Sequence, residues 1–159
     1  VLLDLRMPGV SGLDAVRMLT DDAAATRVLV LSVSAEEADV TDAIAAGASG
    51  YVLKDEPVEE VIAGIRAAAA GGARISPGTA TALLGRVRGA IEAGEDLAGG
   101  GLSTTELQVL DLVAAGKADR EVSERLSIGE ATVGDYVRSI VTKLQVERRV
   151  RGAREPHQA

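Results

Sequence analysis

Apolar residues form two kinds of pattern along the 159-residue chain. Three short runs are almost entirely apolar: 1–4, 28–32 and 49–54. Strands of this length and composition suit a parallel sheet that is covered on both faces. Between and after these runs, apolar positions recur at helical spacing, over 12–20, 36–46 and 58–65. The alternation of strand and helix predicts a right-handed, layered α/β unit.

Glycine-rich sequence separates this unit from the rest of the chain. Gly71 and Gly72 end the alternating pattern, and a helix is expected over 79–93. The Gly-rich stretch that follows is typical of a linker. We therefore expect three segments: a partial α/β domain over 1–72, a linker with a helix over 73–101, and a helical domain over 102–159.

From Leu102 the pattern is helical throughout. Ser103 and Glu106 fit a capping box, in which the hydroxyl and the carboxylate each satisfy a backbone N–H. Two further helices are expected, over 119–126 and 130–144, with a tight turn between them. Two short helices joined by a three-residue turn that contains Gly are typical of a helix-turn-helix.

Charge is unevenly distributed on this acidic chain, whose net charge is −7. Residues 1–101 carry 8 basic and 15 acidic side chains, whereas residues 102–155 carry 9 of each. From Arg138 to Arg154 there are 6 basic residues and a single acid, Glu147. This distribution argues against a protein that coats nucleic acid generally, but it leaves a local basic patch at one end.

Composition limits the remaining classes. The chain has no cysteine, which excludes disulfides and thiolate metal sites. Tyr51 and Tyr136 are its only aromatic residues, so its cores must be built from Ala, Val, Leu and Ile. No apolar run reaches transmembrane length, and no secretion signal is visible. We expect a soluble, cytoplasmic protein with no membrane partner.

Three polar side chains stand at the carboxyl ends of successive predicted strands: Asp4, Ser32 and Lys54. Parallel sheets place their sites at this edge, so the three are expected to converge. A carboxylate that attacks phosphorus, an ammonium that balances charge and a hydroxyl that donates to oxygen suit an aspartyl-phosphate site. Taken singly, each residue favours a structural role, as a turn Asp, a helix cap or a solvated charge; the three together at successive strand ends favour the phosphoryl site.

These segments resemble the receiver domains of two-component response regulators. The resemblance lies in three ordered motifs: DLRMPGVSG, LVLSVS and GASGYVLKD. It implies that a sensor histidine kinase phosphorylates Asp4 and that Ser32 and Lys54 bind the phosphoryl group. It further implies that Tyr51 is the aromatic switch residue. Mg²⁺ would be bound by Asp4 and by the backbone carbonyl of Arg6.

The resemblance implies a flavodoxin-like, doubly wound sheet of strand order 2-1-3-4-5. Because nothing precedes Val1, we expect an N-terminally truncated, incomplete version in which the strand over 1–4 is an exposed apolar edge. Receivers hold Mg²⁺ mainly with an acidic pair at the end of their first strand, and that pair is missing here. We therefore expect weakened Mg²⁺ binding and an impaired phosphoacceptor.

The segment over 102–144 resembles the LuxR-type helix-turn-helix of NarL/FixJ response regulators. The order of its parts carries the resemblance: helix, GK, helix, SIGEATV, helix. In that family the third helix enters the major groove of promoter DNA. Contacts from Thr132, Arg138 and Lys143 are therefore implied. For Arg138 and Lys143, a solvated helix face is the alternative.

The sequence departs from this second family at its recognition surface. Gly134 replaces a residue that is usually basic, and Asp135 replaces a neutral residue that contacts bases. After Leu144, the family carries an apolar dimerisation helix, whereas this chain reads QVERRVRGAREPHQA. A homodimer formed through that helix is therefore not expected, although other homodimers stay possible.

These features favour a bacterial response regulator of incomplete α/β receiver fold followed by an all-α helix-turn-helix domain. It would regulate transcription under the control of aspartyl phosphorylation. The alternative is a degenerate interaction module that does not bind DNA, which Gly134 and Asp135 favour. An enzyme is not expected, because Leu5 and Arg6 follow Asp4 and leave no second acid for phosphatase chemistry.

Overall fold

The computed structural model describes the backbone of residues 1–22, 25–94 and 101–154, and side chains up to Gln145 in the last range. Within these ranges the strands are β1 (Leu2–Asp4), β2 (Arg6–Met7), β3 (Val10–Ser11), β4 (Leu29–Ser32), β5 (Gly50–Leu53) and β6 (Arg74–Ile75). The helices are α1 (Gly12–Asp22), α2 (Glu37–Ala45), α3 (Val58–Ala69), α4 (Pro77–Glu92), α5 (Thr104–Ala114), α6 (Asp119–Leu126) and α7 (Glu130–Arg154).

In the described part of the chain, the main sheet is parallel and has the order β1-β4-β5-β6. The pairing of β6 with β5 requires glycine at position 50, because a Cβ there would clash with the carbonyl oxygen of Arg74. β1 is an edge strand of this sheet, as predicted. Val1 and Leu2 are 59% and 47% exposed along it.

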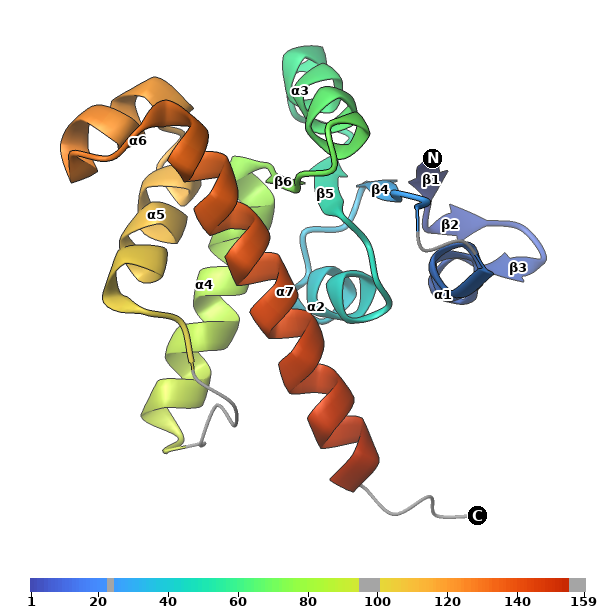
Figure 1. Cartoon of the computed structure of the whole chain (residues 1–159). Coiled ribbons are helices and arrows are strands. Elements are labelled where there is room, and N and C mark those ends of the chain that lie inside the picture. The colour runs from blue at the N-terminus through green and yellow to red at the C-terminus, as the bar shows by residue number, and fades with distance from the viewer. Residues whose placement is uncertain (23–24, 95–100, 155–159) are drawn as a thin grey trace.

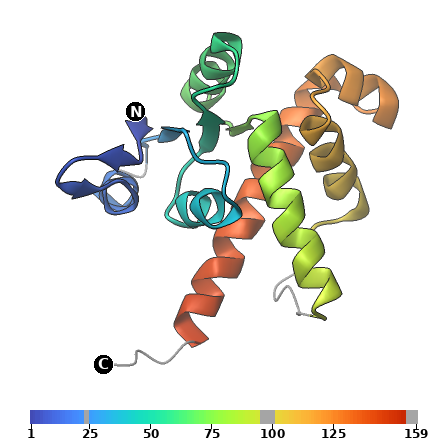
Figure 2. The ribbon, with the colours of Figure 1, turned by 180° about the vertical axis from the view of Figure 1, so that it is seen from behind.

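Helices cover the two faces of the sheet, as the uniformly apolar strands predict. α3 lies on one face, and α1 and α2 lie on the other (Figure 1). α4 contacts both α2 and α5, and α7 runs across α2 and packs on α5 and α6 (Figures 1 and 2). The helical C-terminal part is therefore packed directly on the α/β part.

The predicted α/β alternation and the three-helix pattern are confirmed, but three segments differ from expectation. The segment Met7-Pro8-Gly9, which by its composition is expected to continue neither a strand nor a helix, has Met7 paired with Val10 in the short β2–β3 hairpin. The segment 73–101, expected to hold a helix, also contributes β6. The prediction that the last helix ends at Leu144 is wrong, because α7 runs to Arg154. Its added residues are mostly Gln, Glu, Val and Arg, and Glu, Gln and Arg favour helix even without an apolar face.

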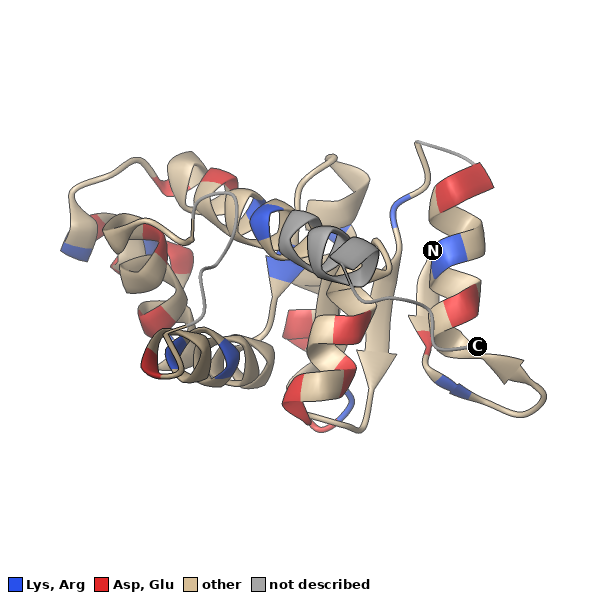
Figure 3. Ribbon diagram, turned by 90° about the horizontal axis from the view of Figure 1, so that it is seen from below, with Lys and Arg blue, Asp and Glu red and all other residues tan. Residues whose placement is uncertain are grey.

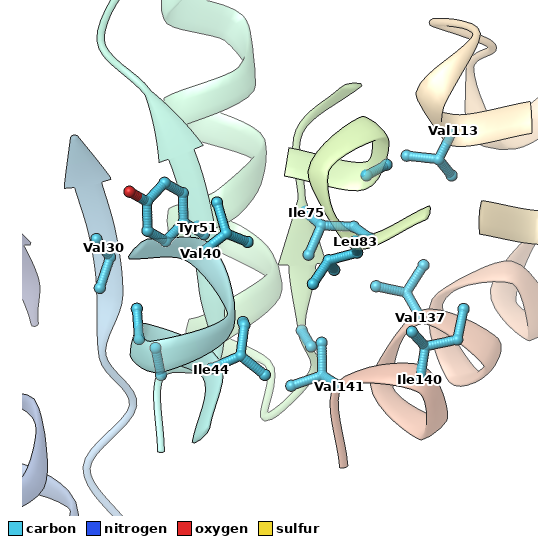
Figure 4. Packing of buried hydrophobic residues seen from close by; sticks show 14 of the residues in the cluster. Val30, Val40, Ile44, Tyr51, Ile75, Leu83, Val113, Val137, Ile140 and Val141 are labelled. Atoms are coloured by element: carbon cyan, nitrogen blue, oxygen red, sulfur yellow. The ribbon is translucent and has the colours of Figure 1, made fainter. Parts of the chain in front are cut away.

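One continuous apolar cluster joins the two parts of the molecule. Val40 and Ile44 lie one turn apart on the same buried face of α2. Val40 lies beside Tyr51 of β5, and Ile44 lies beside Val141 of α7, while Leu83 of α4 belongs to the same cluster (Figure 4). All five side chains are at most 4% exposed. Buried apolar area of this kind is the main favourable term in folding, so α7 and the sheet stabilise one another.

Helices α1 and α2 carry charged residues on their outer faces. In Figure 3, α1 carries both signs of charge and α2 carries acidic residues. On α1, Arg17 and Asp14 form an exposed ion pair of 2.8 Å. None of the helices in the described ranges is long and apolar enough to cross a membrane.

A buried carboxylate fixes α7 to α5. Glu106 is 3% exposed and caps α5 by accepting from the backbone N–H of Ser103 at 2.7 Å, which confirms the predicted capping box. The same carboxylate accepts from the Ser139 hydroxyl at 2.6 Å and from the Lys143 ammonium at 2.8 Å. Burial raises the pKa of Glu106, but these three hydrogen bonds outweigh it and lower that pKa overall.

We predict that Glu106→Gln lowers the free energy of unfolding at pH 7 by about 1–3 kcal/mol, because Lys143 loses its charged partner. Since the pKa of Glu106 is lowered in the folded state, its contribution is present at neutral pH and is lost as the pH falls below about 4. Urea denaturation at pH 3 to 7 measures both effects, with the variant showing the flatter pH profile.

The control for this prediction is Glu124→Gln. The Glu124 side chain is 68% exposed and pairs with Arg120 at 3.4 Å, so its loss is expected to change stability by less than about 1 kcal/mol. Equal stability and parallel pH profiles for the wild type and Glu106→Gln would contradict the role given to Glu106.

Candidate phosphoacceptor and DNA-recognition sites

Asp4 and Lys54 meet at the carboxyl edge of the sheet. Asp4 ends β1 and Lys54 follows β5, and the Lys54 ammonium donates a hydrogen bond to Oδ2 of Asp4. The backbone N–H of Arg6 donates to Oδ1 at 2.9 Å. The hydrogen bond from Lys54, followed by that from Arg6, lowers the pKa of Asp4 below its ordinary value. At neutral pH the side chain is therefore a carboxylate, the form that can act as a nucleophile.

Ser32, the third member of the predicted group, is bonded within its own loop. It is 1% exposed, and its hydroxyl oxygen accepts from the backbone N–H of Ser34 at 3.2 Å. Ser32 also lines a surface cavity of about 250 Å³ together with Arg6 and Asp39. The structure thus brings Asp4 and Lys54 into direct contact and places Ser32 at the neighbouring strand end.

Tyr51, the predicted switch residue, is fully buried on β5. Its hydroxyl donates to the backbone carbonyl of Ser34 at 2.8 Å, and burial raises the pKa of its phenol. The ring lies beside Val30 and Val40 (Figure 4). Tyr51 and Ser32 therefore bond to the same residue, Ser34, at the start of the loop that leads into α2.

The residues present do not fit a Mg²⁺ site. Mg²⁺ prefers six oxygen ligands in near-octahedral arrangement, commonly including one or two carboxylates. In the described ranges there is no group of three or more His, Cys, Asp or Glu side chains that could hold a metal. Both carboxylate oxygens of Asp4 already accept hydrogen bonds, and Arg6 lies in β2, paired opposite Ser11.

The predicted DNA-contacting residues have different environments on α7. Thr132 is half-buried in the first turn. Arg138 is 54% exposed and forms an ion pair of 2.8 Å with Asp135. Lys143 is 40% exposed, and its ammonium is bound by the buried carboxylate of Glu106. Arg138 is therefore available to a partner, whereas Lys143 has a structural role.

An ion-pair link between the two parts was not predicted from the sequence. Arg74 of β6 donates to Glu60 of α3 at 2.9 Å and to Asp119 of α6 at 3.5 Å. These three residues line a pocket of about 450 Å³ between α3 and the helix-turn-helix. No local sequence signal marks Arg74, because its partners are distant in the chain.

Most of the predicted C-terminal basic patch lies outside the described side chains. This applies to Arg148, Arg149, Arg151 and Arg154, whose backbone belongs to α7. The larger part of the Gly-rich linker, residues 95–100, also lies outside the described residues.

Comparison with known proteins identifies both parts. Residues 1–66 match the family model of the response regulator receiver domain, and residues 101–155 match that of bacterial regulatory proteins of the luxR family. A crystal structure of a LuxR-family two-component response regulator from Aurantimonas is similar, with 33% identity and a TM-score of 0.50. That similarity covers 54% of this chain and 61% of the other.

Similarity over nearly the whole of this chain extends to named regulators. The nitrate/nitrite response regulator protein NarL of Escherichia coli is 35% identical over 158 residues, covering 99% of this chain and 73% of NarL. The transcriptional regulatory protein MctR of Rhizobium johnstonii is 32% identical over 146 residues, covering 92% of this chain and 65% of MctR. The chain thus spans about two thirds to three quarters of the length of these relatives. It belongs to the family of two-component response regulators that join a receiver domain to a LuxR-type DNA-binding domain.

Proposed function

We propose that this chain regulates transcription by binding promoter DNA through α7, with Asp4 as its phosphoryl acceptor and a sensor histidine kinase as the donor. The observation that carries the proposal is the pair of sites in one chain. The Asp4–Lys54 ion pair lies at the carboxyl edge of a parallel sheet, and α7 presents an exposed face with Arg138. A regulator that must reach chromosomal DNA acts in the cytoplasm.

The chemistry of Asp4 follows from its neighbours. One carboxylate oxygen forms a bond to phosphorus while the P–N bond of the donor's phosphohistidine breaks and the imidazole leaves. Lys54 exchanges its bond to Asp4 for one to the phosphoryl oxygens and offsets their charge. The Ser32 hydroxyl would donate to a phosphoryl oxygen after rotating away from Ser34. Tyr51, bonded to the same loop, would respond to that change.

The residues around Asp4 offer few ligands to Mg²⁺. Receiver domains of this family typically bind Mg²⁺, but the donors described here amount to Asp4 and the carbonyl of Arg6. We propose that the 159-residue polypeptide is a weak phosphoacceptor, because the described side chains offer too few oxygen ligands for this ion.

The DNA-reading role is assigned to the helix-turn-helix over 102–159, with 1–72 as the receiver part and 73–101 as their connection. We propose Arg138 as the main DNA contact and the Thr132 hydroxyl, in the first turn of α7, as a donor to a DNA phosphate. We do not propose Lys143 as a DNA contact, because its ammonium is bound by the carboxylate of Glu106.

We predict that the chain binds a random-sequence 25-base-pair duplex at low salt and that Arg138→Ala weakens this binding by roughly tenfold, as expected for the loss of one cationic DNA contact. Fluorescence anisotropy at several salt concentrations measures the affinity and its salt slope. The matched control is Arg17→Ala, because Arg17 forms an equivalent ion pair of 2.8 Å with Asp14 on α1. The titration endpoint also reports how many chains bind each duplex.

Absence of DNA binding at low salt would contradict this function and favour an interaction module that does not bind DNA. Equal losses in Arg138→Ala and Arg17→Ala would show that Arg138 acts only through overall charge.

We predict that the 159-residue chain, incubated with Mg²⁺ and acetyl phosphate, gives well under one phosphoryl group per chain. Intact-mass spectrometry at neutral pH measures the adduct, and Asp4→Asn provides the background. A stoichiometric adduct that disappears in Asp4→Asn would overturn the assignment of a weak acceptor while confirming Asp4 as the nucleophile.

A further inference from the structure

The middle of α7 presents a narrow exposed stripe opposite its buried side. The buried side consists of Val133, Val137, Ile140 and Val141, each at most 7% exposed. The exposed stripe follows the helical repeat through Ala131, Asp135, Arg138 and Thr142. Its two charged members are Asp135 and Arg138. Packing of α7 on α2 and α5 therefore leaves this acid–base pair open to solvent.

Asp135 and Arg138 form a defined pair. Nη2 of Arg138 donates to Oδ1 of Asp135 at 2.8 Å, and the two side chains are 54% and 65% exposed. A guanidinium carries five N–H donors, so the remainder of the fork can bind a second acceptor. A carboxylate has two oxygens and several lone pairs, so Asp135 can accept another donor while holding Arg138.

Space beside the pair is open on α7. A Cβ placed on the adjacent Gly134 would meet nothing within 4 Å. On α7 itself, no side chain at position 134 therefore stands between a base edge and Asp135 or Arg138; Gly134 also lines the pocket that faces α3. Three residues of helix rise about 4.5 Å, close to the 3.4 Å spacing of successive bases, so the two side chains reach the same or neighbouring base pairs.

A carboxylate on a DNA-facing helix repels phosphates, so it weakens binding to every sequence unless it finds a donor. In the major groove, cytosine N4 offers that donor and is the base group that Asp and Glu accept from. Arginine binds the two acceptors of guanine, O6 and N7, with its fork. The chemistry of this pair thus matches a guanine and a cytosine.

We propose that Asp135 and Arg138 act together as the specificity-determining pair of α7, with Arg138 binding guanine and Asp135 selecting cytosine on the same or a neighbouring base pair. This inference rests on the proposed DNA-binding function. The pair also predicts which bases are disfavoured. Guanine or thymine opposite Asp135 offers the carboxylate hydrogen-bond acceptors and no donor, so either base weakens binding.

Selection of binding sites from a randomised duplex pool, with the full 159-residue chain, tests the pair. The wild type is expected to enrich a guanine with a cytosine at a fixed neighbouring or paired position. Asp135→Asn is expected to change the selected cytosine to adenine, whose N6 and N7 match an amide. Arg138→Lys keeps the charge but loses the fork, so enrichment of guanine is expected to fall roughly tenfold or more.

Asp14→Asn is the matched control, because Asp14 and Arg17 form the same i,i+3 pair on α1. It is expected to leave the selected sequence unchanged. Circular dichroism verifies that all variants fold, which is expected because exposed ion pairs contribute little to stability.

The outcomes separate the two levels of the proposal. If Asp135→Asn binds all sequences more tightly but selects the same bases as the wild type, Asp135 is only a repulsive charge and the specificity pair is overturned. If the wild type binds no DNA at low salt, the proposed function fails and the pair fails with it. A change from cytosine to adenine in Asp135→Asn alone establishes the pair.

Discussion

The packing of α7 against α2 is the contact on which the rest of the structure depends. Ile44 of α2 and Val141 of α7 lie beside each other in a cluster that also includes Leu83 of α4 (Figure 4). With two tyrosines as its only aromatics, the chain builds its cores from smaller aliphatic residues. Neither part has large side chains with which to bury extra area alone. A shared cluster increases the apolar surface area that each part buries. It also determines which face of α7 stays exposed to solvent.

That cluster also connects the sheet edge that carries Asp4 and Lys54 to α7. Lys54 and Tyr51 lie three residues apart on the β5 segment, one bound to Asp4 and the other packed in the core. The Tyr51 hydroxyl is bonded to the loop before α2, and α2 carries the Ile44 contact to α7. A contiguous set of buried side chains is the physical condition under which a local charge change can bias a distant helix.

Local patterns in the sequence predicted most of this architecture, because strands, helices and caps are determined by neighbouring residues. The capping box at Ser103 and Glu106 and the parallel strands are examples. The meeting of Asp4 with Lys54 also followed, since parallel strands end at a common edge. Ion pairs between charged residues that are distant in the sequence could not be predicted from it. Lys143 is of a residue type that commonly contacts DNA. Only the fold shows that its ammonium is bound by Glu106, which lies 37 residues away in the sequence.

The other differences from the sequence-based prediction have both long-range and local causes. Arg74 finds Glu60 and Asp119 only once α3, β6 and α6 have been placed in space. The apolar stripe of α7 ends at Leu144, which predicts too short a helix. The helix continues to Arg154 because the residues after Leu144 include several of high helix propensity. Asp135 departs from the residue type expected at its position, and its bond to Arg138 gives that departure a chemical meaning.

The shared core can be tested by placing one tyrosine reporter in each part. Tyr136→Phe leaves Tyr51 in β5 as the fluorophore, and Tyr51→Phe leaves Tyr136 in α7. Each single-tyrosine variant is followed in urea both by its tyrosine fluorescence and by circular dichroism at 222 nm. If one cluster holds the molecule together, the two signals of each variant give the same midpoint and the same slope. Unfolding of the Tyr136 signal at a urea concentration clearly different from that of the circular dichroism transition would show two independent domains and contradict the shared core.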